Sequence, residues 1–86
     1  MPWFRVTFRG PEVSPAAREA LATGENIGLV HDRQAERHDP EHHTALIFAD
    51  TGEAAIDIVM TASEPHGNYN FFEAFTYPPE GTIERL

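Results

Sequence analysis

The chain of 86 residues carries 14 acidic and 6 basic side chains, which gives a net charge of −8 with neutral histidines. Nucleic acids and anionic membranes select basic surfaces, so a chain this acidic is expected to bind neither. Cysteine is absent, which excludes disulfides and thiolate chemistry. No apolar run reaches the ~20 residues of a membrane span, and the start of the chain lacks the layout of a signal peptide. A cytoplasmic location is therefore expected.

The first half of the chain predicts a strand, a helix and a second strand. Apolar and polar residues alternate over Trp3–Arg9, which is the period of a strand. Ser14 and Pro15 then form a typical helix start, and the helix is expected to run to about Thr23. Ile27–Arg37 is predicted to be a strand that becomes polar towards its end.

The second half predicts a turn, a central strand, a longer helix and a last strand. His38–His42 has the composition of a turn, and Thr44–Ala49 is short and apolar on both faces, as in a central strand. Asp50 followed by Glu53 resembles a capping box and predicts a helix start. This helix has a polar stripe at helical spacing, formed by Glu53, Asp57, Thr61 and Glu64.

Tyr69–Tyr77 is the predicted last strand, and two prolines follow it. Residues 1–79 are therefore expected to form one α+β domain, and residues 80–86 a C-terminal tail.

The resulting order, β-α-β-β-α-β, resembles the ferredoxin-like arrangement. This resemblance implies a four-stranded antiparallel-type sheet in the order 4-1-3-2, with both helices on one face. Domains of the dimeric α+β barrel kind pair through the opposite, open face of such a sheet. The fold itself hosts many unrelated functions.

Alternation predicts which side chains lie on the open face. If Phe4, Val6 and Phe8 face the helices, Trp3, Arg5 and Arg9 face the other way. The last strand would lie beside the first and place a second set on the same face, with Glu73 as a partner for Arg5. This second set is Tyr69, Phe71, Glu73, Phe75 and Tyr77.

Three interpretations of this aromatic face stay open. A second copy of the chain could cover it, because interfaces concentrate aromatic residues and arginine. It could also line a pocket for a small aromatic or carboxylate-bearing ligand, with Arg5 or Arg9 holding the anion. In the third interpretation the strand is turned over, the aromatic residues are core, and Glu73 is a buried carboxylate.

The histidines offer weaker signals. His38, His42 and His43 lie close together in the sequence with Asp39 and Glu41, and imidazoles suit zinc, copper or nickel. The spacing matches no established metal motif, so a solvated loop without a metal or cofactor is expected.

His31 is a candidate general base if it opens onto a pocket, and Glu73 is a candidate acid or base.

These patterns favour a small acidic binding domain that forms a homodimer through its aromatic face and binds a small molecule or a protein. One alternative is a cofactor-independent enzyme of the dimeric α+β barrel kind, such as an isomerase, cyclase or monooxygenase. Another is an acidic inhibitor or immunity-type protein for a basic partner, which requires the charged stripe of the second helix to merge with Asp32, Glu36 or Asp39.

Overall fold

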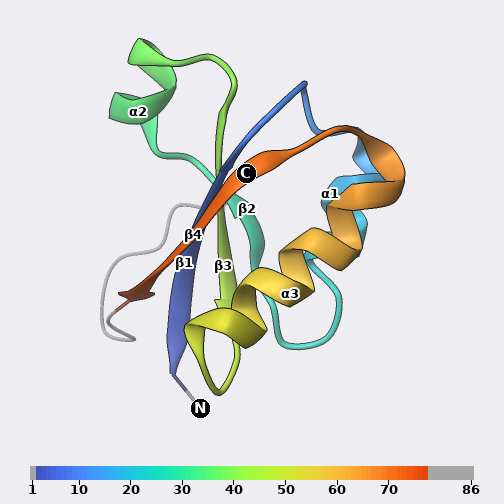
Figure 1. Ribbon diagram of the computed structural model, residues 1–86, viewed down its shortest axis with the longest axis vertical. Coiled ribbons are helices and arrows are strands. Elements are labelled where there is room, and N and C mark those ends of the chain that lie inside the picture. Colours follow the sequence, from blue (N-terminus) through green and yellow to red (C-terminus); the bar gives the residue numbers. More distant parts are fainter. Residues whose placement is uncertain (1, 78–86) are drawn as a thin grey trace.

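A computed structural model describes residues 2–77, which form an α+β structure with a four-stranded antiparallel sheet (Figure 1). The tail predicted for residues 80–86 lies outside the described residues. None of the helices within residues 2–77 is long and apolar enough to cross a membrane. The elements are β1 (Trp3–Arg9), α1 (Pro15–Leu21), β2 (Gly28–Val30), α2 (Arg33–His38), β3 (His42–Phe48), α3 (Gly52–Ser63), a 3-10 turn η1 (Glu64–His66) and β4 (Asn70–Tyr77).

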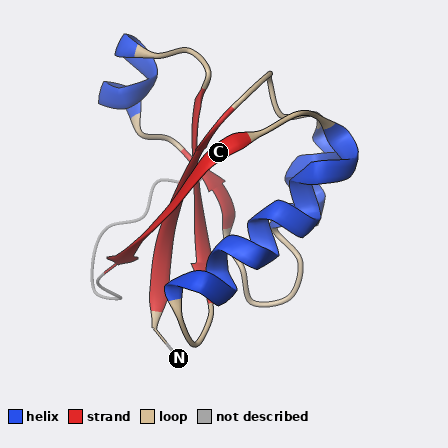
Figure 2. Cartoon of the chain, viewed as in Figure 1, coloured by secondary structure: helices blue, strands red, loops and turns tan. Residues whose placement is uncertain are grey.

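The strands lie in the order β2-β3-β1-β4, which is the expected order read from the other edge. Helices α1 and α3 lie on the same side of the sheet and contact each other (Figures 1 and 2). The sheet and these two helices fit the ferredoxin-like arrangement broadly. Helix α2 is an addition to it and lies at one end of the sheet, away from α1 and α3.

The core lies between β1, β3 and the two helices on that side. Val6 and Phe8 of β1 are fully buried, and Phe4 packs against the same cluster. Leu21 of α1 and Val59 of α3 complete the other half of the core and are also fully buried. The alternation predicted for the first strand is therefore confirmed, and it fixes which side of β1 faces the helices.

The prediction of one long strand over Ile27–Arg37 is wrong in its second half. The strand β2 covers only Gly28–Val30, and Arg33–His38 is helical. The cause is Asp32, whose side chain accepts a hydrogen bond at 3.2 Å from the backbone N–H of Ala35. An aspartate in this position satisfies a free N–H group of the first turn and starts a helix where strand alternation ends.

Other boundaries shift by one or two residues. β3 begins at His42 instead of Thr44, because all of β1 pairs with it as far as Arg9 opposite His42. α1 ends at Leu21 instead of Thr23. The cap of α3 is Thr51, whose hydroxyl accepts from the N–H of Ala54 at 3.1 Å, and not the predicted Asp50.

The polar stripe of α3 is exposed as predicted, and Ala55 and Val59 on its other side are buried.

The largest correction concerns Tyr69. The register between β1 and β4 shifts by one residue, since Thr7 lies opposite Glu73 but Arg9 lies opposite Asn70. Phe71 and Phe72 together therefore oppose the single residue Phe8, which is a β-bulge. A bulge reverses the alternation of the residues before it.

As a result Tyr69 faces the core, with 9% of its surface exposed, instead of the open face. Its ring meets the Phe8 ring edge-on, with the centroids 5.5 Å apart, while Phe72 stacks on Phe8 at 5.6 Å. Its hydroxyl donates to the carbonyl of Glu12 at 3.3 Å.

The core position of Tyr69 predicts a clear mutational pattern. Tyr69→Ala should lower the free energy of unfolding by about 3–5 kcal/mol, because it removes a buried ring. Tyr69→Phe keeps the ring and loses one long hydrogen bond, so its cost should not exceed about 1 kcal/mol. Urea unfolding followed by circular dichroism measures both. Equal small effects would mean that Tyr69 is outside the core.

Candidate functional site

The strand register arranges the open face of the sheet in rows. Residues directly opposite each other in an antiparallel pair point to the same side, so each row contains one residue from β3, β1 and β4. We call the three rows the aromatic face. They are Phe48–Trp3–Tyr77, Leu46–Arg5–Phe75 and Thr44–Thr7–Glu73.

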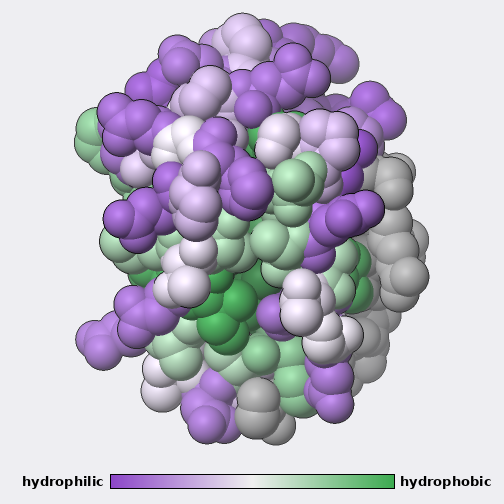
Figure 3. Space-filling model, turned by 90° about the vertical axis from the view of Figure 1, so that its right-hand side faces the viewer, coloured by the Kyte–Doolittle hydropathy of each residue, from purple (hydrophilic) through white to green (hydrophobic). Residues whose placement is uncertain are grey.

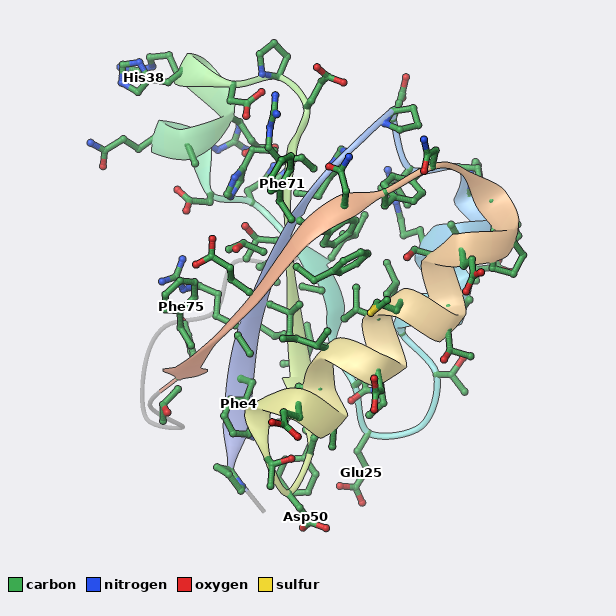
Figure 4. All side chains as sticks on the ribbon, viewed as in Figure 1. Phe4, Glu25, His38, Asp50, Phe71 and Phe75 are labelled. Carbon is green, nitrogen blue, oxygen red and sulfur yellow. The ribbon has the colours of Figure 1, made fainter. Side chains whose placement is uncertain are left out.

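The aromatic face is unevenly exposed. Its β3 side is closed, since Leu46 and Thr44 are only 1% and 2% exposed. Its β4 side is open: Phe75 is 41% exposed, and Phe71, just beyond the rows at the bulge, is 67% exposed. Phe75 points away from α3, as Figure 4 shows.

Of the five residues predicted for this strand, Phe71, Glu73 and Phe75 are therefore exposed and Tyr77 is half-buried, while Tyr69 lies in the core. The interpretation with a buried Glu73 is wrong.

The ring of Trp3 contacts the ring of Phe48, with the centroids 5.1 Å apart. Together with Tyr77 on the other side of Trp3, these side chains form an aromatic row across three strands at one end of the sheet. Phe48 was not predicted to lie on this face, because β3 is apolar on both sides and has no alternation that would orient it.

Arg5 occupies the middle row. Its guanidinium lies 4.7 Å from the centroid of the Phe75 ring, a cation–π contact. It also lies 4.0 Å from the carboxylate of Asp32, at the limit of an ion pair. The expected pairing of Arg5 with Glu73 is not formed within residues 2–77, where Glu73 lies opposite Thr7 and has no ion pair.

Arg9 is held more firmly. Its Nε donates to the carboxylate of Asp39 at 2.7 Å, its second contact to that carboxylate is 3.3 Å, and Glu41 is 3.6 Å away. Asp39 caps the C-terminal end of α2, so the two arginines attach the α2 segment to the end of the sheet. Arg9 is therefore already occupied, which argues against its predicted role as an anion holder for a ligand.

The ion pair perturbs the acidity of Asp39. The hydrogen bond from Arg9 holds the pKa of Asp39 below its ordinary value, and the N–H of Glu41 adds to this, while partial burial opposes it. A carboxyl with a lowered pKa stabilises the fold above the ordinary pKa of aspartate. This contribution is lost as the pH falls through the lowered value.

We expect NMR titration of the Asp39 carboxyl carbon to give a midpoint below the ordinary aspartate value of about 3.9. Arg9→Met should raise that midpoint towards the ordinary value. It should also speed hydrogen exchange of the α2 amides at neutral pH, because the segment loses its anchor. Identical midpoints in the two proteins would contradict the role assigned to Arg9.

The three histidines considered for a metal do not converge. His38 projects from the far end of α2 (Figure 4), while His42 and His43 are neighbours on β3 and so point to opposite faces. His42 contacts the Thr44 hydroxyl at 3.1 Å. His43 donates from Nε2 to the carbonyls of Gly10 and Pro11, both at 3.0 Å. Within residues 2–77 no cluster of three potential ligands could hold a metal ion.

His31 opens onto a pocket, which is the condition for a role as a general base. The pocket has a volume of about 220 Å³ and lies between the start of α1, the end of β2 and α2. The Nδ1 of His31 lies 3.2 and 3.3 Å from the two carboxylate oxygens of Glu36.

Glu36 was not predicted as this partner, because the α2 segment was expected to be strand and only a helix turns Glu36 back towards His31. Arg18, which was not predicted as a site residue, lines the same pocket.

The helix-covered side of the sheet carries a more open feature. An open groove of about 490 Å³ runs between α1 and α3 and is lined by Ala20, Ile58 and Ala62 among others. Figure 3 shows this side, with apolar side chains around a hollow near its middle.

The acidic stripe of α3 lies on this side, whereas Asp32 and Asp39 flank α2 at the other end of the sheet. The two acidic groups therefore do not merge into one patch.

Comparisons with models of known protein families, with curated proteins and with solved structures found no match.

Proposed function

We propose that this chain is a small binding domain of ferredoxin-like topology that self-associates through the β4 side of its aromatic face. The observation that carries the proposal is the state of Phe71. Its side chain is 67% exposed, and its backbone has φ of +56°. A bulky residue rarely adopts this left-handed conformation, which costs about 1–3 kcal/mol.

An exposed phenylalanine in such a conformation lowers the stability of the fold, and no packing of its ring in the core offsets this loss. The bulge itself needs one residue in this conformation, and glycine or asparagine would supply it at less cost. The Phe71 ring is not part of the core, and Phe75, four residues further along β4, is also exposed. Two exposed aromatic rings on one strand are the composition of an interface.

The charges of the face favour a second copy of the same chain as the partner. The ion pair of Arg5 with Asp32 is long, at 4.0 Å, and Glu73 is an exposed carboxylate without an ion pair among residues 2–77. Most homodimers have twofold symmetry, so every contact occurs twice with the roles of the two chains exchanged. The face therefore complements itself if Arg5 of one chain meets Glu73 of the other. Dimeric α+β barrels associate through the same side of the sheet.

The proposal predicts the effect of Phe71→Asn on association. Asparagine tolerates the left-handed conformation, so the variant should be as stable as the wild type or up to about 1 kcal/mol more stable. It should nevertheless associate more weakly by about tenfold or more, because an interface anchor is lost. Sedimentation equilibrium over a range of concentrations measures the dissociation constant, and urea unfolding measures stability.

Met60→Gln is the matched control, since Met60 is as exposed as Phe75 but lies on α3. It should leave association unchanged. A wild-type chain that stays monomeric at high micromolar concentration would contradict the proposal, as would equal effects of the two substitutions.

The pairing of Arg5 with Glu73 between chains has its own test. Arg5→Glu and Glu73→Arg should each weaken self-association, because each places like charges together at both symmetric positions. An equimolar mixture of the two variants should associate again, since the mixed dimer restores both pairs. Sedimentation of the separate and mixed samples shows this. If mixing restores nothing, Arg5 and Glu73 do not meet across the interface.

A ligand or protein partner of this domain would bind through the same face. Trp3, Phe75 and Tyr77 offer aromatic surface, and Arg5 offers a cation already stacked on a ring. An acidic inhibitor is less favoured as a function, because its steering patch would need the two acidic groups that lie at different sides of the molecule.

A further inference from the structure

We infer that the pocket beside His31 is a binding site for a small monocarboxylic acid. The pocket is distinct from the aromatic face and rests on no part of the proposed self-association. Three of the five histidines, His31, His42 and His43, line it together with Arg18, Glu12 and Glu36. His42 and His43 reach the pocket from opposite faces at the end of β3, and the Nε2 of each already contacts a group of the chain. Arg18 and the ring of His31 are therefore the groups left to bind a ligand.

The hydrogen bonds of the pocket orient its imidazoles. A carboxylate only accepts hydrogen bonds, so the contact with Glu36 assigns a hydrogen to Nδ1 of His31. The Nε2 of His31 is then left to interact with a ligand, as an acceptor when neutral and as a donor when protonated. A histidine whose ring is held in this way by a carboxylate loses little freedom when it binds.

Arg18 supplies the cation. Within residues 2–77 it has neither an ion pair nor a side-chain hydrogen bond, in contrast to Arg9, which is fully occupied by Asp39. A guanidinium binds a carboxylate through two parallel hydrogen bonds, which fixes the orientation of the ligand. Arg18 is exposed on α1, so its side chain can extend into the pocket without losing contacts in the core.

The acidic residues restrict the charge of the ligand. Glu36 is engaged with His31, but Glu12 is an exposed carboxylate on the rim and has no ion pair among the described residues. Its repulsion of a doubly charged anion such as phosphate is stronger than its repulsion of a single carboxylate, and it would accept a hydrogen bond from a hydroxyl or amino group of the ligand. A volume of about 220 Å³ also admits only a small molecule.

Lactate is a suitable probe, because it combines one carboxylate with one hydroxyl. We expect titration of isotope-labelled protein with sodium lactate to shift the NMR signals of the Arg18 guanidinium and the His31 ring. The shifts should saturate with a dissociation constant of about 1 mM, as is usual for a ligand of few atoms. Sodium chloride and sodium phosphate at the same ionic strength should produce no saturating shift.

Arg18→Met should weaken lactate binding by about tenfold or more, since a charge-assisted hydrogen bond is lost. His31→Gln should also weaken it, while its amide can still donate to Glu36. Arg37→Met is the matched control, because it removes the same charge from α2 outside the pocket and should leave binding unchanged.

Three results would overturn the inference: shifts that follow ionic strength alone, saturation by phosphate in place of lactate, or lactate binding that survives in Arg18→Met. The folded state of each variant is checked by its amide spectrum, so a loss of binding through unfolding is recognised.

Discussion

The arrangement of this protein depends on one irregularity, the β-bulge of β4 opposite Phe8. Two residues, Phe71 and Phe72, occupy the space that one residue would fill in a regular ladder. Phe72 takes the inner position and stacks on Phe8, while Phe71 is turned out in the left-handed conformation. The reversal of alternation then brings Tyr69 into the core against Phe8. Both the inward position of Tyr69 and the outward position of Phe71 follow from this one constraint.

The ion pairs on the open face have a structural consequence of their own. Arg5 and Arg9 reach from β1 to Asp32 and Asp39, the two residues that flank α2. Helix α2 has no buried residue, so it has little apolar surface with which to hold itself to the sheet. The ion pairs with β1 and the backbone hydrogen bond from His42 to Asp39 join it to the sheet. The position of α2 in turn brings Glu36 to His31 and closes one side of the pocket beside His31.

The two proposed surfaces are thus connected through β1 and α2 but have different chemistry. The aromatic face offers large rings and a self-complementary pair of charges, which suits a second copy of the chain. The pocket beside His31 offers one free guanidinium and the oriented imidazole of His31 in a small volume, which suits a small acid. Neither surface uses the acidic stripe of α3, which faces solvent on the other side of the sheet. That stripe keeps the exterior of α3 polar.

Much of the fold could be predicted from the sequence, because it depends on local patterns. The alternation of Trp3–Arg9, the Ser14–Pro15 helix start and the exposed stripe of α3 are each set by neighbours within a few residues. The strand order could be predicted as well, because few topologies connect these elements. Asp32 is a helix-capping residue and could have indicated the start of α2, but the alternation of the residues before it predicted a strand.

Much of the candidate site, in contrast, depended on tertiary structure. The sequence placed Arg5, Phe71 and Phe75 on a common face by alternation alone. It could not show that a bulge opposite Phe8 moves Tyr69 to the core, because the bulge is a property of the pairing between β1 and β4. Nor could it show that Glu36 meets His31, that Arg9 pairs with Asp39, or that Arg18 lines the same pocket as His31 and Glu36. These contacts join residues through long-range packing, and no local period in the sequence records them.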